Sequence, residues 1–199
     1  LPVIGQRRVI ERVSRDFAID RARVYSIGMS NGGLMSYRLA CELSGTIAGI
    51  MAVAGTDNTS SCQPTSPVRV LHVHAADDDH VLFNGGAGPA ARNASAITSF
   101  TSVPATVAKW RALNRAAASP RRVLDVPGAY CDLYPAERGG APVQLCVTET
   151  GGHSWPGGRK PRAGEVGDCP TACGWRWRYG GGRPGPNRRC ASGIRCSPA

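Results

Sequence analysis

The stretch from Arg23 to Leu39, RVYSIGMSNGGLMSYRL, most constrains what this chain can fold into. Residues 24–27 favour a short β-strand, and residues 34–39 carry apolar side chains at helical spacing. Between them, Gly28-Met-Ser-Asn-Gly32 has the G-x-S-x-G pattern of a sharp turn from strand to helix that exposes its serine. The N–H groups of a helix N-terminus favour developing negative charge. The pattern predicts Ser30 as a catalytic nucleophile, the alternative being a plain glycine-rich turn.

The rest of the chain predicts alternating strands and helices. The continuous apolar run at residues 47–54 is typical of a parallel strand buried on both faces. We expect an α/β fold, with a mostly parallel sheet, flanking helices and a site at the carboxyl ends of the strands. The expected helices cover residues 4–17, 31–44 and 102–118, and the expected strands cover residues 24–27, 47–54, 68–74, 121–126 and 143–148. Ile4, Val9, Ile10, Val13 and Phe17 form one apolar face of the first helix.

A serine nucleophile needs a base and a carboxylate that orients the base. Among the four histidines, His153 lies between glycines directly after the last expected strand, which favours it as the base. His72 and His74 face the same side of one strand and are interpreted as packed or structural. The acid is expected in the loop after that strand, where residues 77–79 are three consecutive aspartates, and the pattern alone does not choose among them.

A metal site is the main alternative for these residues. His72-x-His74, followed by three aspartates and His80, is similar to a cluster of metal ligands. It is the weaker hypothesis, because Ser30 and His153 would then lack their third partner. We therefore expect no metal.

Charge and composition set residues 159–199 apart from the rest. The net charge is +10, and this segment holds nine basic and two acidic residues, so the body of the chain is nearly balanced. The segment is rich in Gly, Pro, Arg and Cys and poor in apolar residues, which predicts little regular structure. We expect a catalytic domain at residues 1–158 and a basic tail at residues 159–199. Binding of a polyanion through the tail remains an alternative, although no nucleic acid is expected.

Eight cysteines in a chain of 199 residues favour an oxidising compartment and disulfides over buried free thiols. Cys41, near the end of the helix after Ser30, is predicted to pair with Cys62 in the following polar loop. Cys131 and Cys146 flank a hairpin-like segment and form a second candidate pair. The spacing of the four tail cysteines is poor for zinc. No run approaches the ~18 apolar residues of a membrane span, and we expect export.

Three separated motifs resemble those of one family. Residues 25–41, YSIGMSNGGLMSYRLAC, look like the nucleophile region of polyhydroxybutyrate depolymerase-type esterases, which include feruloyl and acetylxylan esterases among the α/β-hydrolases. Residues 71–86 are similar to that family's acid-loop motif, and residues 151–158, GGHSWPGG, match its histidine motif. The resemblance covers about residues 4–158.

The resemblance implies hydrolysis of acyl esters through a Ser30–Asp78–His153 triad and an acyl-enzyme, without a cofactor, in a secreted or periplasmic protein. It also implies that the Asn31 N–H is an oxyanion donor and that Trp155 and Met29 border the substrate pocket. Small or polymeric esters are the expected partners. Residues 75–77 are Ala-Ala-Asp where Gly-Thr-Ala is usual, so Asp77 stays an alternative to Asp78.

Two departures from the family pattern leave further alternatives open. The family has a long N-terminal stretch, with the first strands and a second oxyanion donor, that is absent here, which permits an inactive fragment of the same fold. The composition of residues 159–199 is typical of a shifted reading frame. Peptide hydrolysis would use the same triad. The acyl group, the alcohol and the oligomeric state do not follow from the sequence.

Overall fold

Apolar strands and amphipathic helices alternate along the chain and assemble into one layered α/β sheet. The structure is a computed structural model that describes residues 3–91 and 99–158. The expected division at residue 159 therefore lies outside the described residues. The elements are α1 (Val3–Asp16), a short 3-10 turn η1 (Arg21–Arg23), β1 (Tyr25–Met29), α2 (Asn31–Glu42), β2 (Gly49–Val53), β3 (Arg69–Ala75), α3 (Val103–Leu113), β4 (Arg121–Val126), β5 (Ala129–Tyr134) and β6 (Val143–Thr148).

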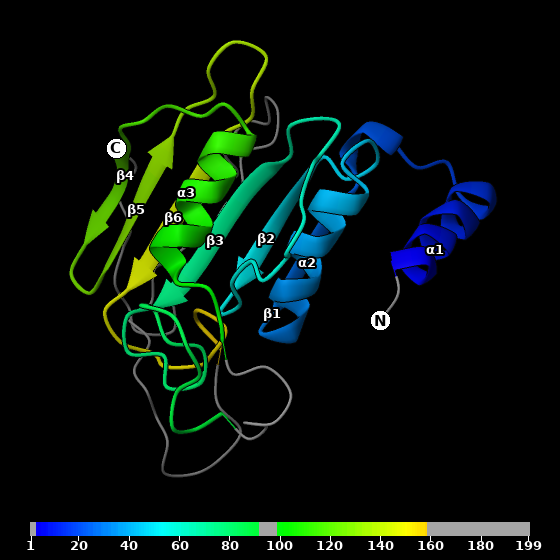
Figure 1. The fold of residues 1–199 in the computed structure, drawn as a ribbon. Helices are drawn as coiled ribbons and strands as arrows, with labels where there is room; N and C mark the ends of the chain where they lie inside the picture. Colours follow the sequence, from blue (N-terminus) through cyan, green and yellow to red (C-terminus); the bar gives the residue numbers. More distant parts are fainter. Residues whose placement is uncertain (1–2, 92–98, 159–199) are drawn as a thin grey trace, which may run out of the picture.

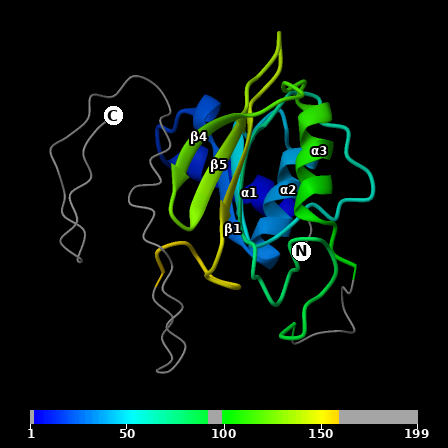
Figure 2. The same cartoon turned by 90° about the vertical axis from the view of Figure 1, so that its left-hand side faces the viewer.

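The sheet has the order β1-β2-β3-β6-β5-β4. Strands β1, β2, β3 and β6 are parallel, and β5 runs antiparallel to both β6 and β4. Helices α2 and α3 cover one face of the sheet, as the two perpendicular views show (Figures 1 and 2). Because the four parallel strands end at the same edge, the loops that begin at residues 30, 76 and 149 share that edge. The expected α/β fold with a mostly parallel sheet is confirmed.

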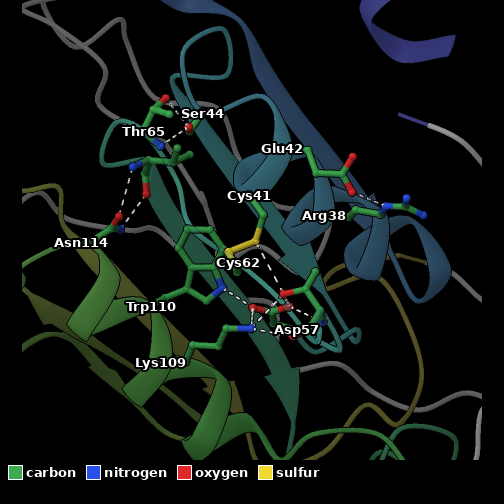
Figure 3. The surroundings of a disulfide bond; sticks show 12 residues. Arg38, Cys41, Glu42, Ser44, Asp57, Cys62, Thr65, Lys109, Trp110 and Asn114 are labelled. Carbon is green, nitrogen blue, oxygen red and sulfur yellow. Dashed lines mark hydrogen bonds and ion pairs between the residues drawn. A yellow bond between two sulfur atoms is a disulfide. The ribbon is translucent and has the colours of Figure 1, made fainter. Parts of the chain in front are cut away.

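A buried aspartate ties the loop after β2 to α3 beneath the helix layer (Figure 3). Asp57 accepts a hydrogen bond from the Trp110 indole N–H at 2.8 Å and pairs with the Lys109 ammonium at 2.9 Å. It also accepts from the Thr59 backbone N–H at 2.8 Å and from the Thr59 hydroxyl at 2.7 Å. Since the Asp57 side chain is fully buried, these four donors offset the loss of its hydration.

Both predicted disulfides in the described part of the chain are formed. The Cys41–Cys62 bond joins α2 to the loop after β2. The Cys131–Cys146 bond joins directly opposed residues of the antiparallel pair β5 and β6. Strand β5 was not predicted from the sequence; only Pro127 and Gly128 separate it from β4. The four remaining cysteines lie outside the described residues.

The third helix is shorter than predicted, ending at Leu113 rather than continuing to residue 118. The Asn114 side chain turns into the core, where its amide donates to the Val68 carbonyl at 2.7 Å and its oxygen accepts from the Val68 N–H at 3.1 Å. Arg115 then has φ of 49°, which no α-helix accommodates. This fixed attachment to the start of β3 ends the helix.

The first helix forms as predicted, but most of its apolar face is exposed. Ile4, Val9 and Phe17 are each more than 60% exposed, and Val3 is the buried residue of α1. The reason is that β1 is the edge strand of the sheet, so within residues 3–91 and 99–158 no strand lies beyond it. In that part of the chain no helix has the length and apolar character needed to cross a membrane.

We predict that Lys109→Met lowers the free energy of unfolding by about 3 kcal/mol, because the Asp57 carboxylate stays buried after its cation is removed. Urea unfolding followed by circular dichroism measures the change. The control is the double variant Asp57→Asn/Lys109→Met, which removes the charge as well and should lose less than the sum of the two single variants. Unfolding of Lys109→Met at the wild-type midpoint would contradict the prediction.

Candidate active site

Ser30 sits in a strained turn between β1 and α2. Its backbone has φ of 56° and ψ of −120°, a conformation that costs a non-glycine residue about 1–3 kcal/mol. Two hydrogen bonds hold it there: the Ser30 N–H donates to the Val53 carbonyl at 2.8 Å, and the Ser30 carbonyl accepts from the Leu34 N–H at 3.0 Å. The candidate nucleophile is thus fixed at the first turn of a helix, where unpaired N–H groups face outward.

Glycines make this turn possible through close backbone approach. A Cβ on Gly28 would lie 2.3 Å from both the carbonyl carbon and the carbonyl oxygen of Gly32. A Cβ on Gly55, in the loop after β2, would lie 2.3 Å from the Ser30 carbonyl oxygen. The chain therefore folds back against itself on both sides of Ser30, and larger residues would displace the serine.

Asp78 is a buried carboxylate surrounded by N–H donors. Its Oδ1 accepts from the backbone N–H groups of His80 at 2.9 Å and Val81 at 3.0 Å. His153 Nδ1 lies 3.0 Å from Oδ2 and 3.2 Å from Oδ1. Burial by itself would raise the pKa of the Asp78 carboxyl, but the hydrogen bonds from His153, His80 and Val81 together outweigh it, so the pKa lies below its usual value. Asp78 is accordingly ionised near neutral pH.

The neighbouring Asp77 has different partners. Its carboxylate accepts from the backbone N–H of Gly152 at 2.8 Å and of Gly151 at 3.3 Å. These glycines directly precede His153, so Asp77 anchors the loop while Asp78 contacts the imidazole. The sequence left the two aspartates as alternatives, and the structure gives each one a separate contact.

The ring of His153 lies between Asp78 and His80. Because the carboxylate is an acceptor, the imidazole carries its proton on Nδ1 and leaves Nε2 with a free lone pair. His80 stacks on this ring with centroids 4.5 Å apart, and its own Nδ1 lies 2.7 Å from the Asp79 carboxylate. Ser30 lies at the same edge of the sheet, yet within the described residues no hydrogen bond joins its hydroxyl to His153.

The remaining predicted pocket residues lie in different surroundings. Asn31 borders a groove of about 640 Å³ that runs along α2, with Leu34, Met35 and the polar residues 58–61 also in its walls. Met29, at the end of β1, is half-buried and packs against apolar residues of the opposite sheet face. Trp155 is 40% exposed in the loop after β6. Of the three, Asn31 is the one that this groove contacts.

The alternative metal hypothesis starts from His72-x-His74 together with the three aspartates and His80 that follow. The rings of His72 and His74 are buried in the core and bind each other. Ligand atoms of Asp78, His80 and His153 do lie within 4.8 Å of one another. Both Asp78 oxygens, however, lie within hydrogen-bond distance of His153 or backbone N–H groups, which favours the triad interpretation of this cluster over a metal site.

Two supporting contacts were not predicted from the sequence: Asp77 on the glycine N–H groups and the stacking of His80 on His153. Both join segments that are more than 70 residues apart in the chain. In the sequence, Asp77 is one of three consecutive aspartates and His80 follows them. Neither feature indicates the distant residue that each one contacts. Their contribution becomes visible when β3 and β6 are paired in register.

Comparison with known proteins finds esterases. No family model matches the chain. The chain is 29% identical over 154 residues to feruloyl esterase B of Piromyces equi, which covers 74% of this chain and 28% of that protein. It is 29% identical over 167 residues to "Putative esterase NocK" of Nocardia uniformis subsp. tsuyamanensis, which covers 78% of this chain and 48% of that protein.

A shorter match of 72 residues joins the chain at 29% identity to the bifunctional acetylxylan esterase/xylanase XynS20E of Neocallimastix patriciarum, covering 36% of this chain and 11% of that protein. The chain thus spans less than half the length of the relatives it matches. Similarity to proteins named as esterases supports an α/β-hydrolase fold, and the six-stranded, mostly parallel sheet with its flanking helices agrees with a part of that fold.

We predict that Gly28→Ala lowers the free energy of unfolding by roughly 3 kcal/mol, because its Cβ would overlap the Gly32 backbone. Gly32→Ala is the matched control, since a Cβ at Gly32 meets nothing within 4 Å and alanine favours a helix. Chemical denaturation of both variants measures the difference. Equal stability of the two would contradict the close approach at Gly28.

We also predict that the protein becomes less stable as the pH falls below about 6.5. Burial first, and the neighbouring His74 second, hold the pKa of His72 well below 6.5; burial also lowers the pKa of His74. Both rings regain a pKa of about 6.5 when the chain unfolds, so the unfolded state binds more protons in this range. The loss approaches about 1.4 kcal/mol per pH unit for each histidine.

Urea midpoints between pH 7.5 and pH 5.0 check this dependence. Asp78 contributes only near pH 4 and below, because that is where its carboxyl titrates in the unfolded chain. His72→Asn should reduce the slope, because the variant lacks the buried imidazole that regains its usual pKa on unfolding. A midpoint that is constant over this range would contradict the prediction.

Proposed function

We propose that this chain is a serine esterase in which Ser30 attacks an acyl ester, His153 is the general base and Asp78 orients the base. The observation that carries the proposal is the contact of a buried, ionised Asp78 with His153 Nδ1 at 3.0 Å, at the sheet edge where Ser30 occupies a strained turn. Strain of this kind concentrates at functional positions. Similarity to proteins named as feruloyl and acetylxylan esterases supports the ester as the substrate.

The proposed reaction follows from the groups at this edge. His153 Nε2 removes the proton from the Ser30 hydroxyl as the oxygen attacks the ester carbonyl carbon. Asp78 stabilises the imidazolium that forms, and the Asn31 N–H at the start of α2 stabilises the oxyanion. The imidazolium then gives its proton to the leaving alcohol, and an acyl group remains on Ser30. Water, activated by His153, releases the acid.

The groove along α2, whose wall includes Asn31, the residue after Ser30, is proposed to hold the substrate. Its walls combine the apolar side chains of Leu34 and Met35, the ion pair of Arg38 and Glu42, and hydroxyl and amide groups from residues 58–61. Such mixed walls suit the acyl or alcohol part of a feruloyl, acetyl-polysaccharide or polyhydroxyalkanoate ester. The two disulfides agree with an oxidising compartment and support a secreted protein. Residues 159–199 are proposed as a separate basic tail.

A catalytically inactive fold with surviving triad residues is the second candidate. Two observations favour it: no hydrogen bond joins the Ser30 hydroxyl to His153 among the described residues, and Ile27 on the edge strand β1 is 63% exposed. Against it, catalytic hydrogen bonds often form fully only when a substrate binds. Reaction with an active-site probe separates the two candidates.

The first experiment is labelling with a fluorophosphonate probe, followed by mapping of the labelled peptide. We expect labelling at Ser30 and its loss in Ser30→Ala. In ester hydrolysis, Asp78→Asn should lower kcat by about 10⁴, as in other serine enzymes that lose this carboxylate. Asp77→Asn is the matched control, and its effect should be much smaller because Asp77 contacts only the glycine loop. A folded wild-type chain that is not labelled, or a larger loss in Asp77→Asn, would contradict the proposal.

A further inference from the structure

A buried chain of hydrogen bonds runs from the core to the loop that carries Asp78. The Tyr37 hydroxyl lies 2.8 Å from His72 Nδ1, and His72 Nε2 lies 3.2 Å from His74 Nδ1. At the far end, His74 Nε2 lies 2.8 Å from the Val81 carbonyl oxygen. The three side chains are at most 1% exposed. The proposed mechanism does not use any of them.

The carbonyl at the end of this chain determines every proton position in it. A carbonyl oxygen only accepts, so His74 Nε2 carries a hydrogen and donates it to Val81. His74 is neutral, because burial lowers its pKa, and its Nδ1 is therefore an acceptor. Consequently His72 Nε2 donates to His74, and His72 Nδ1 accepts from the hydroxyl of Tyr37. All hydrogen bonds run in one direction, from Tyr37 to Val81.

We propose that His74 is a positioning residue that holds the Asp78 loop in place for the proposed esterase reaction. Its hydrogen bond fixes the carbonyl of Val81, and the N–H of the same Val81 donates to Asp78 Oδ1 at 3.0 Å. His74 Nε2 is also 3.4 Å from Asp78 Oδ2. One neutral imidazole at the end of β3 thus secures a residue that in turn holds the acid against His153. The inference rests on the proposed function.

The chain ends on a carbonyl oxygen, which accepts a hydrogen bond but does not take up the proton, so no proton relay leads through it to Asp78. A second proton on His74 would occupy Nδ1, which already accepts from His72, and the two rings would then present hydrogens to each other. Asp78 therefore receives its direct hydrogen bonds from His153 and from the backbone N–H groups of His80 and Val81, not from a protonated His74. The surroundings of His74 agree with a neutral ring, since it stacks on His72 and makes an edge-to-face contact with Phe83.

His74→Gln and His74→Leu test the role. The glutamine amide can reach the Val81 carbonyl as the imidazole N–H does, whereas leucine packs well but donates nothing. We expect His74→Leu to lower kcat roughly tenfold, the effect of one lost hydrogen bond, with little change in KM, and His74→Gln to recover most of the rate. Tyr37→Phe removes the donor at the opposite end of the chain, and it should lose stability but keep kcat. If the role of His74 is merely structural, kcat of His74→Leu should equal or exceed that of His74→Gln.

A second readout does not need turnover. ¹⁵N-edited NMR should find both His72 and His74 neutral with hydrogen on Nε2, and a downfield Nδ1 proton on His153 that persists in His74→Gln and is lost in His74→Leu. If the wild-type protein hydrolyses no ester, the esterase proposal is refuted. The NMR result would still decide whether His74 positions the Asp78 loop. Hydrogen on His74 Nδ1, a His153 proton that survives in His74→Leu, or unchanged kcat in that variant would overturn the inference.

Discussion

The candidate site depends on the hydrogen bonds that surround the buried carboxylate of Asp78. Placing a charge in the core is costly unless donors surround it, and here the donors come from separate parts of the fold. Two belong to the backbone of its own loop, and one belongs to His153, 75 residues further along the chain. The burial of this carboxylate therefore requires β3 and β6 to be adjacent and parallel, as they are in the sheet.

The local parts of the fold were predictable from the sequence for local reasons. Gly28 and Gly32 mark the sharp turn because backbone segments there approach too closely for a side chain at position 28. A continuous apolar run predicted the strand at residues 47–54, and the two disulfides followed from where the cysteines lie relative to the helix after Ser30, the polar loop and the hairpin-like segment. In each case the residues that allow the prediction and the residues that they contact lie within about 20 positions of each other in the sequence.

The parts that were missed depend on distant partners. The end of α3 is set by the bonds of Asn114 to Val68, 46 residues earlier, and helical periodicity contains no trace of such a contact. The roles of Asp77 and Asp78 differ because residues 151–153 reach them from β6. The apolar face of α1 was visible in the sequence, but its exposure depends on β1 being the sheet edge. The sequence pattern predicts the type of each secondary-structure element, whereas its tertiary contacts depend on how the elements pack.

Ser30 is held from both sides, and the support that comes from β2 belongs to a segment that is itself firmly fixed. Ser30 follows the edge strand β1, so the strain of its turn is opposed from the β2 side, through the hydrogen bond to Val53 and the close contact with Gly55. The loop that begins at Gly55 is in turn held by the Asp57 contacts to Trp110 and by the disulfide to α2. A strained residue persists only where its surroundings over-determine its conformation. Here a buried ion pair and a covalent bond, both outside the proposed chemistry, supply that constraint to the serine.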